Sequence, residues 1–206
     1  QVTFATDMYF FWDYQFMHMY WRYFMWNFGA RTSDIQDMGW WKGFMEPSDY
    51  PDELSSQQGH NNYYLIPFFI GLLGMVFQFF RNPKDATSIL LLFFFTGVAI
   101  ILYLNQTPAQ PRERDYSYAG SFQTFAIWVG LGVIAIYELL RNYLKGASSY
   151  AAAALGLIAP ILMGTQNWDD HDRSRRYTSP QSAYNLLNSC QKNGILFTNG
   201  DNDTFP

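Results

Sequence analysis

Four stretches of the chain contain no charged residue and are long enough to cross a membrane. They cover residues 63–80, 86–104, 119–137 and 147–164, and residues 86–104 are the strongest candidate. A membrane-spanning helix needs about 20 predominantly apolar residues. A buried core helix of a large soluble protein is the alternative for any one stretch, but four in succession argue against it. The pattern predicts an all-α polytopic membrane protein with a four-helix transmembrane region over residues 63–164.

Two short turns separate these stretches and indicate how the helices are oriented. Residues 81–85 and 138–146 each hold two Lys or Arg residues, and turns this short join antiparallel neighbours. Because short loops rich in Lys and Arg stay in the cytoplasm, we expect both turns on that side. The extracytoplasmic segments are then residues 1–62, 105–118 and 165–206.

Residues 8–28 are dominated by aromatic side chains, and 16 of these 21 residues are apolar or aromatic. Gln15, His18 and Arg22 are spaced by three and four residues, so they share one face of a predicted helix. Trp and Tyr favour the headgroup level of a membrane, which predicts a helix lying along the interface. The alternative is a lipid-phosphate site at His18 and Arg22, because Arg binds phosphate bidentately. Residues 29–62 are polar and predict an extramembrane loop.

The composition of the 206 residues narrows the class of protein. Charged residues make up 15% of the chain, against roughly 25% in soluble domains, and aromatic residues make up 20%. A net charge of −4 provides no basic surface, so we expect no nucleic-acid partner. The single cysteine, Cys190, excludes a disulfide and a four-cysteine zinc site within the chain. The chain begins at Gln1 rather than Met, and we expect it to be an internal piece of a longer protein.

The segment between the second and third apolar stretches carries a compact group of charges. Arg112, Arg114 and Asp115 lie just before Tyr116, where the headgroup of a lipid would meet water. Asp115 could act as a general base or a metal ligand, and the arginines could bind a phosphate. The alternative is a solvated charge cluster that only marks the membrane surface, and the sequence leaves both open.

A second charged group follows the fourth apolar stretch. Its acidic and imidazole side chains could bind a divalent cation, and its arginines could neutralise a phosphate leaving group. The residues are Asp169, Asp170, His171, Asp172, Arg173, Arg175 and Arg176. Mutual charge neutralisation at a helix end is the alternative. Adjacent acids alone are a weak metal signal, because metal ligands normally come from separate elements.

The end of the chain predicts a small α/β segment within residues 165–206. Residues 194–198 are typical of a short strand, and Asp201 and Asp203 follow it. The spacing of these two acids is that of the metal-binding carboxylates in nucleotide-sugar glycosyltransferases, so both are weak metal-ligand candidates. An ordinary turn is the other interpretation, since Asn-Gly and Asp-Asn pairs favour turns.

Four stretches together resemble one family of membrane proteins. They are MYWRYFMWNF at 19–28, PRERDYSYAGSF at 111–122, WDDHDRSRRY at 168–177 and NGDNDTFP at 199–206. The family consists of large Bacteroidetes inner-membrane proteins named domain of unknown function 2723 (DUF2723), and it is related to a eukaryotic protein O-mannosyltransferase. Its members resemble C-type glycosyltransferases, which have many membrane helices, a polyprenyl-phosphate sugar donor and an extracytoplasmic active site.

The resemblance implies an enzyme of the bacterial inner membrane that transfers a sugar from polyprenyl phosphate to a protein hydroxyl, with its long loops in the periplasm. It also implies that the decisive catalytic acid lies in an earlier extracytoplasmic loop, which we expect upstream of Gln1. Among the residues present, the candidate catalytic residues are Asp115 and Asp170. The candidate substrate-binding residues are Arg22, Arg112, Arg114, Tyr116, His171, Arg173 and Arg176, and the weak metal-ligand candidates are Asp169, Asp172, Asp201 and Asp203.

The expected partners are membrane lipid, the lipid-linked sugar, a protein acceptor and an envelope complex, and a divalent metal ion is the cofactor candidate. Two other functions fit the same residues. One is a non-catalytic membrane subunit or scaffold of an envelope complex, whose loops bind a partner. The other is a lipid-linked-sugar transporter, in which the charged loops gate the substrate rather than react with it.

Overall fold

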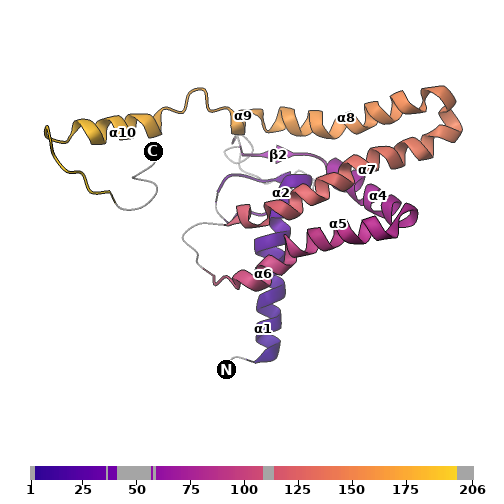
Figure 1. Ribbon diagram of the computed structural model, residues 1–206, viewed down its shortest axis with the longest axis horizontal. Coiled ribbons are helices and arrows are strands. Elements are labelled where there is room, and N and C mark those ends of the chain that lie inside the picture. The colour runs from indigo at the N-terminus through magenta and orange to yellow at the C-terminus, as the bar shows by residue number, and fades with distance from the viewer. Residues whose placement is uncertain (1–2, 36, 41–56, 58, 109–113, 199–206) are drawn as a thin grey trace. The chain divides into compact units, whose positions relative to one another are not determined.

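The computed structural model describes most of the chain and divides it into two compact units, residues 1–170 and residues 171–206 (Figure 1). The first unit contains the aromatic segment and the apolar helices, and the second contains the last long helix. The described residues are 3–35, 37–40, 57, 59–108 and 114–198.

A continuous helical segment opens the first unit. Its three parts are α1 (Phe4–Phe10), the π-helical η1 (Phe11–Trp21) and α2 (Arg22–Phe28). Thr3 caps it, because the Thr6 hydroxyl accepts a hydrogen bond from the Thr3 amide at 2.8 Å while the Thr3 hydroxyl accepts one from the Thr6 amide. The helix predicted over residues 8–28 is confirmed, and it begins earlier, at Phe4.

Two very short strands follow this segment and were not predicted. β1 (Ala30–Arg31) pairs antiparallel with β2 (Asn61–Asn62), with Ala30 opposite Asn62 and Arg31 opposite Asn61. The Tyr63 amide extends the pairing by donating to the Gly29 carbonyl at 3.0 Å. This ladder fastens the chain after α2 to the chain just before the apolar helices.

The apolar stretches form helices where they are predicted, with two local differences. The helices are α4 (Ile66–Arg81), α5 (Pro83–Phe95), α6 (Val98–Leu104), α7 (Ala119–Leu144) and α8 (Ser148–Gln166). α4 starts after Tyr63 because Tyr64 and Leu65 have φ angles of 52° and 57°, which end any helix there. The second predicted span is interrupted at Thr96 and Gly97, between α5 and α6.

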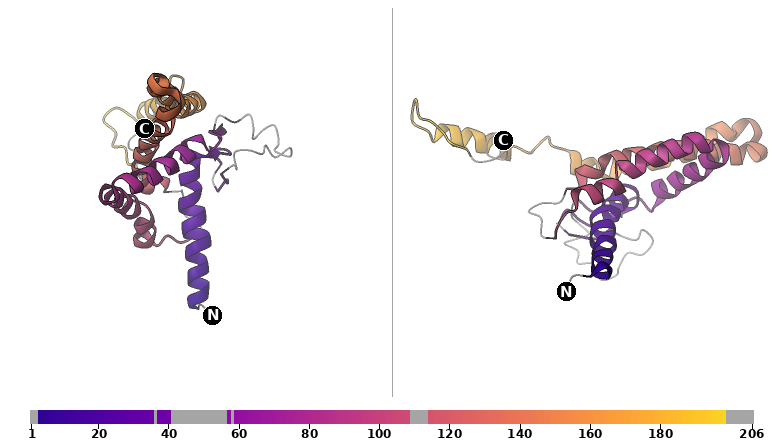
Figure 2. Two further views of the ribbon diagram at one scale, coloured as in Figure 1. Left: turned by 90° about the vertical axis from the view of Figure 1, so that its right-hand side faces the viewer. Right: turned by 60° about the horizontal axis from the view of Figure 1, so that its bottom comes forward.

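Two short 3₁₀ turns flank α7. η2 (Asp115–Tyr118) precedes it, and η3 (Lys145–Ala147) joins it to α8 in a helical hairpin. The turn between α4 and α5 and the turn between α7 and α8 lie at the same end of the helices (Figure 1). α4 and α7 lie side by side along their lengths (Figure 2).

The core of the first unit is built on the second half of the aromatic segment. Phe24, Met25 and Phe28 pack with Phe125 and Trp128 of α7, and all five are buried. A second cluster joins Tyr20 to Ile101 and Tyr118. Gln15 and Arg22 are also buried, so these two polar side chains of the aromatic segment face the protein interior. That the segment lies along a membrane interface stays a prediction. The first half keeps exposed aromatic side chains, Phe4, Tyr9 and Trp12 among them.

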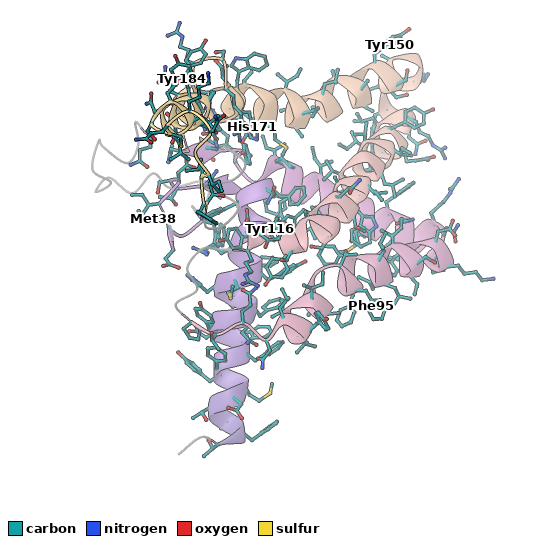
Figure 3. The ribbon with its side chains drawn as sticks, turned by 60° about the vertical axis from the view of Figure 1, so that its left-hand side comes forward. Met38, Phe95, Tyr116, Tyr150, His171 and Tyr184 are labelled. Carbon is teal, nitrogen blue, oxygen red and sulfur yellow. The ribbon has the colours of Figure 1, made fainter. Side chains whose placement is uncertain are left out.

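Two helical stretches are long and apolar enough to cross a membrane, and they indicate membrane association. They are Pro83–Leu104 and Asp115–Gln166, the second of which contains both α7 and α8, while Ile66–Arg81 is a shorter apolar helix. Only 11% of the most apolar part of Pro83–Leu104 is buried, whereas the core helix of a soluble protein would be mostly covered. Phe95 on α5 and Tyr150 on α8 are exposed (Figure 3).

The last helices along the chain are α9 (Trp168–His171) and α10 (Thr178–Asn188). The strand predicted over residues 194–198 is wrong, because these residues lie in irregular structure. A strand needs a neighbour to bind its backbone groups, and the described part of the second unit contains no other strand. The expected α/β character is therefore replaced by a helix and irregular chain in the described residues.

Candidate functional site

The Asp170 carboxylate lies in a polar cluster at the end of α8, which we call the Asp170 cluster (Asn61, Tyr63, Asn167 and Asp170). The Asn61 side-chain Nδ2 donates to Asp170 Oδ2 at 2.6 Å, although the two residues are 109 positions apart in the sequence. The same Nδ2 lies 3.4 Å from Asn167 Oδ1. Asp170 itself is half-buried. Of the two candidate catalytic acids, this is the one that the fold surrounds with polar partners.

Tyr63 and Asn167 connect the two sides of the cluster. The Tyr63 hydroxyl donates to Asn167 Oδ1 at 2.9 Å and accepts from Asn167 Nδ2 at 2.7 Å. Asn167 Nδ2 also donates to the Met163 carbonyl at 2.7 Å, one turn back in α8. The Asn62 amide donates to Gln166 Oε1 at 3.4 Å. These bonds hold the end of α8 against β2.

The charges in and around the cluster affect the pKa of Tyr63, which precedes α4. Burial raises the pKa of the Tyr63 hydroxyl, the hydrogen bond with Asn167 lowers it, and the negative charge of Asp170 raises it further. Arg31 lowers the pKa by its positive charge and stands opposite Asn61 in the strand pair. Tyr63 therefore senses both charges of this region.

Arg31 is held by its own neighbours on the side of α2. Its guanidinium pairs with Asp34 and lies 4.8 Å from the centre of the Trp26 ring. The side-chain Oδ1 of Asn61 and the Nε of Arg31 are buried and have no hydrogen-bond partner among the described residues. A buried acceptor without a donor, or a buried donor without an acceptor, costs stability.

The second candidate acid lies elsewhere in the fold. Asp115 and Tyr116 are in η2, and both side chains are exposed. Figure 3 labels Tyr116. Arg114 is half-buried at the start of the same turn. Arg112 lies outside the described residues. Their catalytic and substrate-binding roles stay predictions.

The charged residues after Asp170 are exposed in the second unit. His171, Asp172, Arg173 and Arg176 are all exposed. Asp172 Oδ1 accepts a hydrogen bond from the Ser174 amide at 2.9 Å. Hydrogen bonds from the Ser174 side chain and backbone lower the pKa of Asp172 below its ordinary value. This turn keeps one carboxylate charged beside the arginines in the sequence.

No group of three or more His, Cys, Asp or Glu side chains that could hold a metal ion occurs in the described ranges. Asp169 is exposed and its Oδ1 accepts from the following amide, of Asp170, at 3.1 Å. Consecutive residues of a helix point in different directions, so adjacent acids in α9 do not converge as ligands. The other two metal-ligand candidates, Asp201 and Asp203, lie outside the described residues.

Arg22 is placed as an internal anchor of the aromatic segment. Its side chain is buried, its Nε donates to the His18 carbonyl at 2.9 Å and its Nη1 donates to the Met38 carbonyl at 3.0 Å. His18 and Trp26, one turn before and after, bind Asp37 and Gly39 at 3.1 and 3.2 Å. One helix face thus binds three consecutive residues of the following loop.

Sequence reasoning missed the residues that surround Asp170. Asn61 and Tyr63 come more than 100 residues earlier in the chain, and neither is charged. Asn167 could have been predicted as a neighbour of Asp170, because it stands three residues before Asp170 at the start of the charged segment. A useful signal would have been the repeated pairs at 61–64, Asn-Asn-Tyr-Tyr, directly before an apolar stretch.

The comparisons with known proteins concern the end of the chain. No curated protein and no solved structure matches the chain. Residues 179–206 match the family TMEM260-associated domain 2. The described part of this match contains most of α10, which spans Thr178–Asn188.

Proposed function

We propose that this chain is part of an integral-membrane glycosyltransferase that moves a sugar from a polyprenyl-phosphate donor to a protein hydroxyl on the extracytoplasmic face. The match of residues 179–206 to TMEM260-associated domain 2 supports the relationship. The activity itself comes from the resemblance to DUF2723 proteins and their eukaryotic O-mannosyltransferase relative. The apolar, exposed helices support membrane association. A multi-pass inner-membrane protein with its long loops in the periplasm is part of the proposal.

The observation that carries this proposal is the Asp170 cluster at the end of an apolar hairpin. A lipid-linked sugar brings a polyprenyl tail, which suits exposed apolar helices, and a polar headgroup, which needs hydrogen-bonding groups at their ends. α8 supplies the apolar surface, with Leu155, Ile158 and Ile161 exposed. Asp170 follows it within four residues of its end, beside the Asn61 amide.

The proposed reaction is a displacement at the anomeric carbon of the donor. The acceptor hydroxyl oxygen forms a bond to this carbon while the bond from the carbon to the phosphate oxygen breaks. Asp170 takes the proton of the hydroxyl as general base, and Asp115 is the second candidate for this role. Arg173, Arg176 and His171, which belong to the second unit, stay candidate substrate-binding residues.

Transfer by the full-length protein in proteoliposomes tests the proposal. The assay contains a polyprenyl-phosphate sugar and an acceptor peptide, and it measures labelled peptide. Asp170→Asn removes the base, so we expect a loss of about 100-fold or more in kcat. Asp85→Asn, in the turn between α4 and α5, is the control and keeps full activity. Full transfer by Asp170→Asn would overturn the assignment of Asp170.

The same preparation separates the two other functions. A transporter moves the labelled donor across the bilayer without any acceptor and forms no glycopeptide. A scaffold shows neither transfer nor movement of the donor, and substitution of Asp115, Asp170 and Arg173 disrupts its complex instead. Either result with active lipid and peptide would replace the glycosyltransferase proposal.

A further inference from the structure

The buried side-chain amide of Asn61 forms a hydrogen bond with the Asp170 carboxylate. The residue exposure of Asn61 is 1%, and its Nδ2 donates to Asp170 Oδ2 at 2.6 Å. A hydrogen bond to an ionised carboxylate is shorter and stronger than one between neutral groups. The contact therefore favours one rotamer of the Asp170 side chain.

Only one of the two polar atoms of the Asn61 side-chain amide has a hydrogen-bond partner among the described residues. Nδ2 faces the carboxylate, whereas Oδ1 has no hydrogen-bond partner among the described residues. Turning the amide over would place Oδ1 against the carboxylate oxygen, with two acceptors facing each other. The buried, unsatisfied Oδ1 costs stability, so the contact of Nδ2 with the carboxylate is kept at that cost.

The position of Asn61 is also fixed by backbone pairing between β1 and β2. Asn61 pairs with Arg31 in the antiparallel ladder, and two residues later the Tyr63 amide donates to the Gly29 carbonyl at 3.0 Å. The Tyr63 hydroxyl and the Asn167 amide exchange bonds at 2.9 and 2.7 Å. Both ends of the contact between Asn61 and Asp170 are thus fixed, one by β2 and one by the end of α8.

We propose that Asn61 is a positioning residue that holds the Asp170 carboxylate in the direction from which it takes the acceptor proton, with Tyr63 and Asn167 fixing the helix end that carries it. This inference rests on the proposed function in so far as Asp170 is the base. The contact between Asn61 and Asp170 is an independent physical claim, and it can be tested without any activity.

The first test reads the cluster through Tyr63, whose hydroxyl senses the charge of Asp170. The full-length protein is labelled with ¹³Cζ-tyrosine in nanodiscs, the Tyr63 signal is assigned with Tyr63→Phe, and its pKa is measured by NMR. Asp170→Asn removes the negative charge and lowers this pKa. Asn61→Leu keeps the site buried but releases the carboxylate, and it also lowers the pKa of Tyr63.

The double variant decides the interpretation. If Asn61 acts through Asp170, Asn61→Leu has no further effect on the pKa of Tyr63 in the Asp170→Asn background. An effect of equal size in both backgrounds would overturn the proposal, because Asn61 would then act on Tyr63 directly. Asn62→Leu is the matched control, since successive side chains of a strand point to opposite faces, and it preserves the response to Asp170→Asn. Asn61→Ser replaces the leucine variant if that protein does not fold.

The second test is the transfer assay. We expect Asn61→Leu to lower kcat about 100-fold, as a misplaced catalytic group does, with KM for donor and acceptor unchanged and no further loss when combined with Asp170→Asn. A change of KM alone would contradict a positioning role. If the wild-type protein transfers no sugar, the proposed function fails, while the coupling at Tyr63 still decides whether Asn61 holds Asp170.

Discussion

At the scale of single residues, Asp172 gives a prediction about pH. Hydrogen bonds from the Ser174 side chain and backbone lower the pKa of Asp172, so the charged form and its turn are favoured. The turn is complete above the ordinary pKa of an aspartate and is lost as the pH falls through the lowered value. Ser174→Ala removes the side-chain bond and moves the pKa of Asp172 back toward its ordinary value. A ¹³C NMR titration measures this shift, and Ser182→Ala in α10 is expected to leave it unchanged.

Arg22 provides a second prediction at this scale. Two of its nitrogens donate to the His18 and Met38 carbonyls, and its guanidinium lies 4.8 Å from the centre of the Tyr23 ring. A lysine cannot reproduce this planar arrangement, so Arg22→Lys should cost about 1–3 kcal/mol of stability. Thermal unfolding in detergent measures the loss, with Arg81→Lys, an exposed arginine, as control.

The alternative for Arg22 is the predicted phosphate contact. In that case Arg22→Lys would unfold at the wild-type temperature and raise KM for the lipid-linked donor. The buried position of the side chain favours the structural role. The two readouts are separate, so one variant distinguishes the two roles.

At the scale of elements, the close contact of α4 and α7 depends on glycines. A Cβ on Gly132 would overlap the Ile70 carbonyl, whereas a Cβ on Gly130, two residues earlier in the same helix, meets nothing within 4 Å. Gly132→Ala should therefore destabilise the pair by about 1–3 kcal/mol. Gly130→Ala should be neutral or stabilise by up to about 1 kcal/mol, because alanine favours helix. Unfolding of both variants in the same micelles measures the difference, and equal behaviour would contradict the packing.

The helices were predictable from sequence because long apolar runs without charge have few other structures. The differences arise from local backbone geometry that hydrophobicity does not report. The left-handed residues Tyr64 and Leu65 delay the start of α4, and Gly97 lies at the break between α5 and α6.

The Asp170 cluster could be predicted only in part. Asp170 was visible as a charge near an apolar stretch, but its bond to Asn61 depends on the pairing of β1 with β2.

At the scale of the whole molecule, the orientation expected from charge requires both basic turns on one side of the membrane. The turn between α4 and α5 and the turn between α7 and α8 lie at one end of the first unit (Figure 1), and each carries basic residues. The stretch Pro83–Leu104 has 22 residues, which would span about 33 Å as one straight helix, although the break at Thr96 and Gly97 divides it into α5 and α6. A bilayer core is about 30 Å thick, so this stretch is long enough to connect its two sides.

Single-cysteine labelling tests this orientation. In a Cys190→Ser background, Lys84→Cys and Gly146→Cys probe the two turns, while Thr107→Cys and Ser182→Cys probe the segments expected outside. We expect a membrane-impermeant maleimide to label Thr107→Cys and Ser182→Cys in intact spheroplasts, and the two turns only after permeabilisation, because positive charge keeps the turns in the cytoplasm. The reverse pattern would invert the topology. Labelling of Lys84→Cys and Thr107→Cys from the same side would show that α5 and α6 do not cross the bilayer, and the proposed site would then lose its membrane setting.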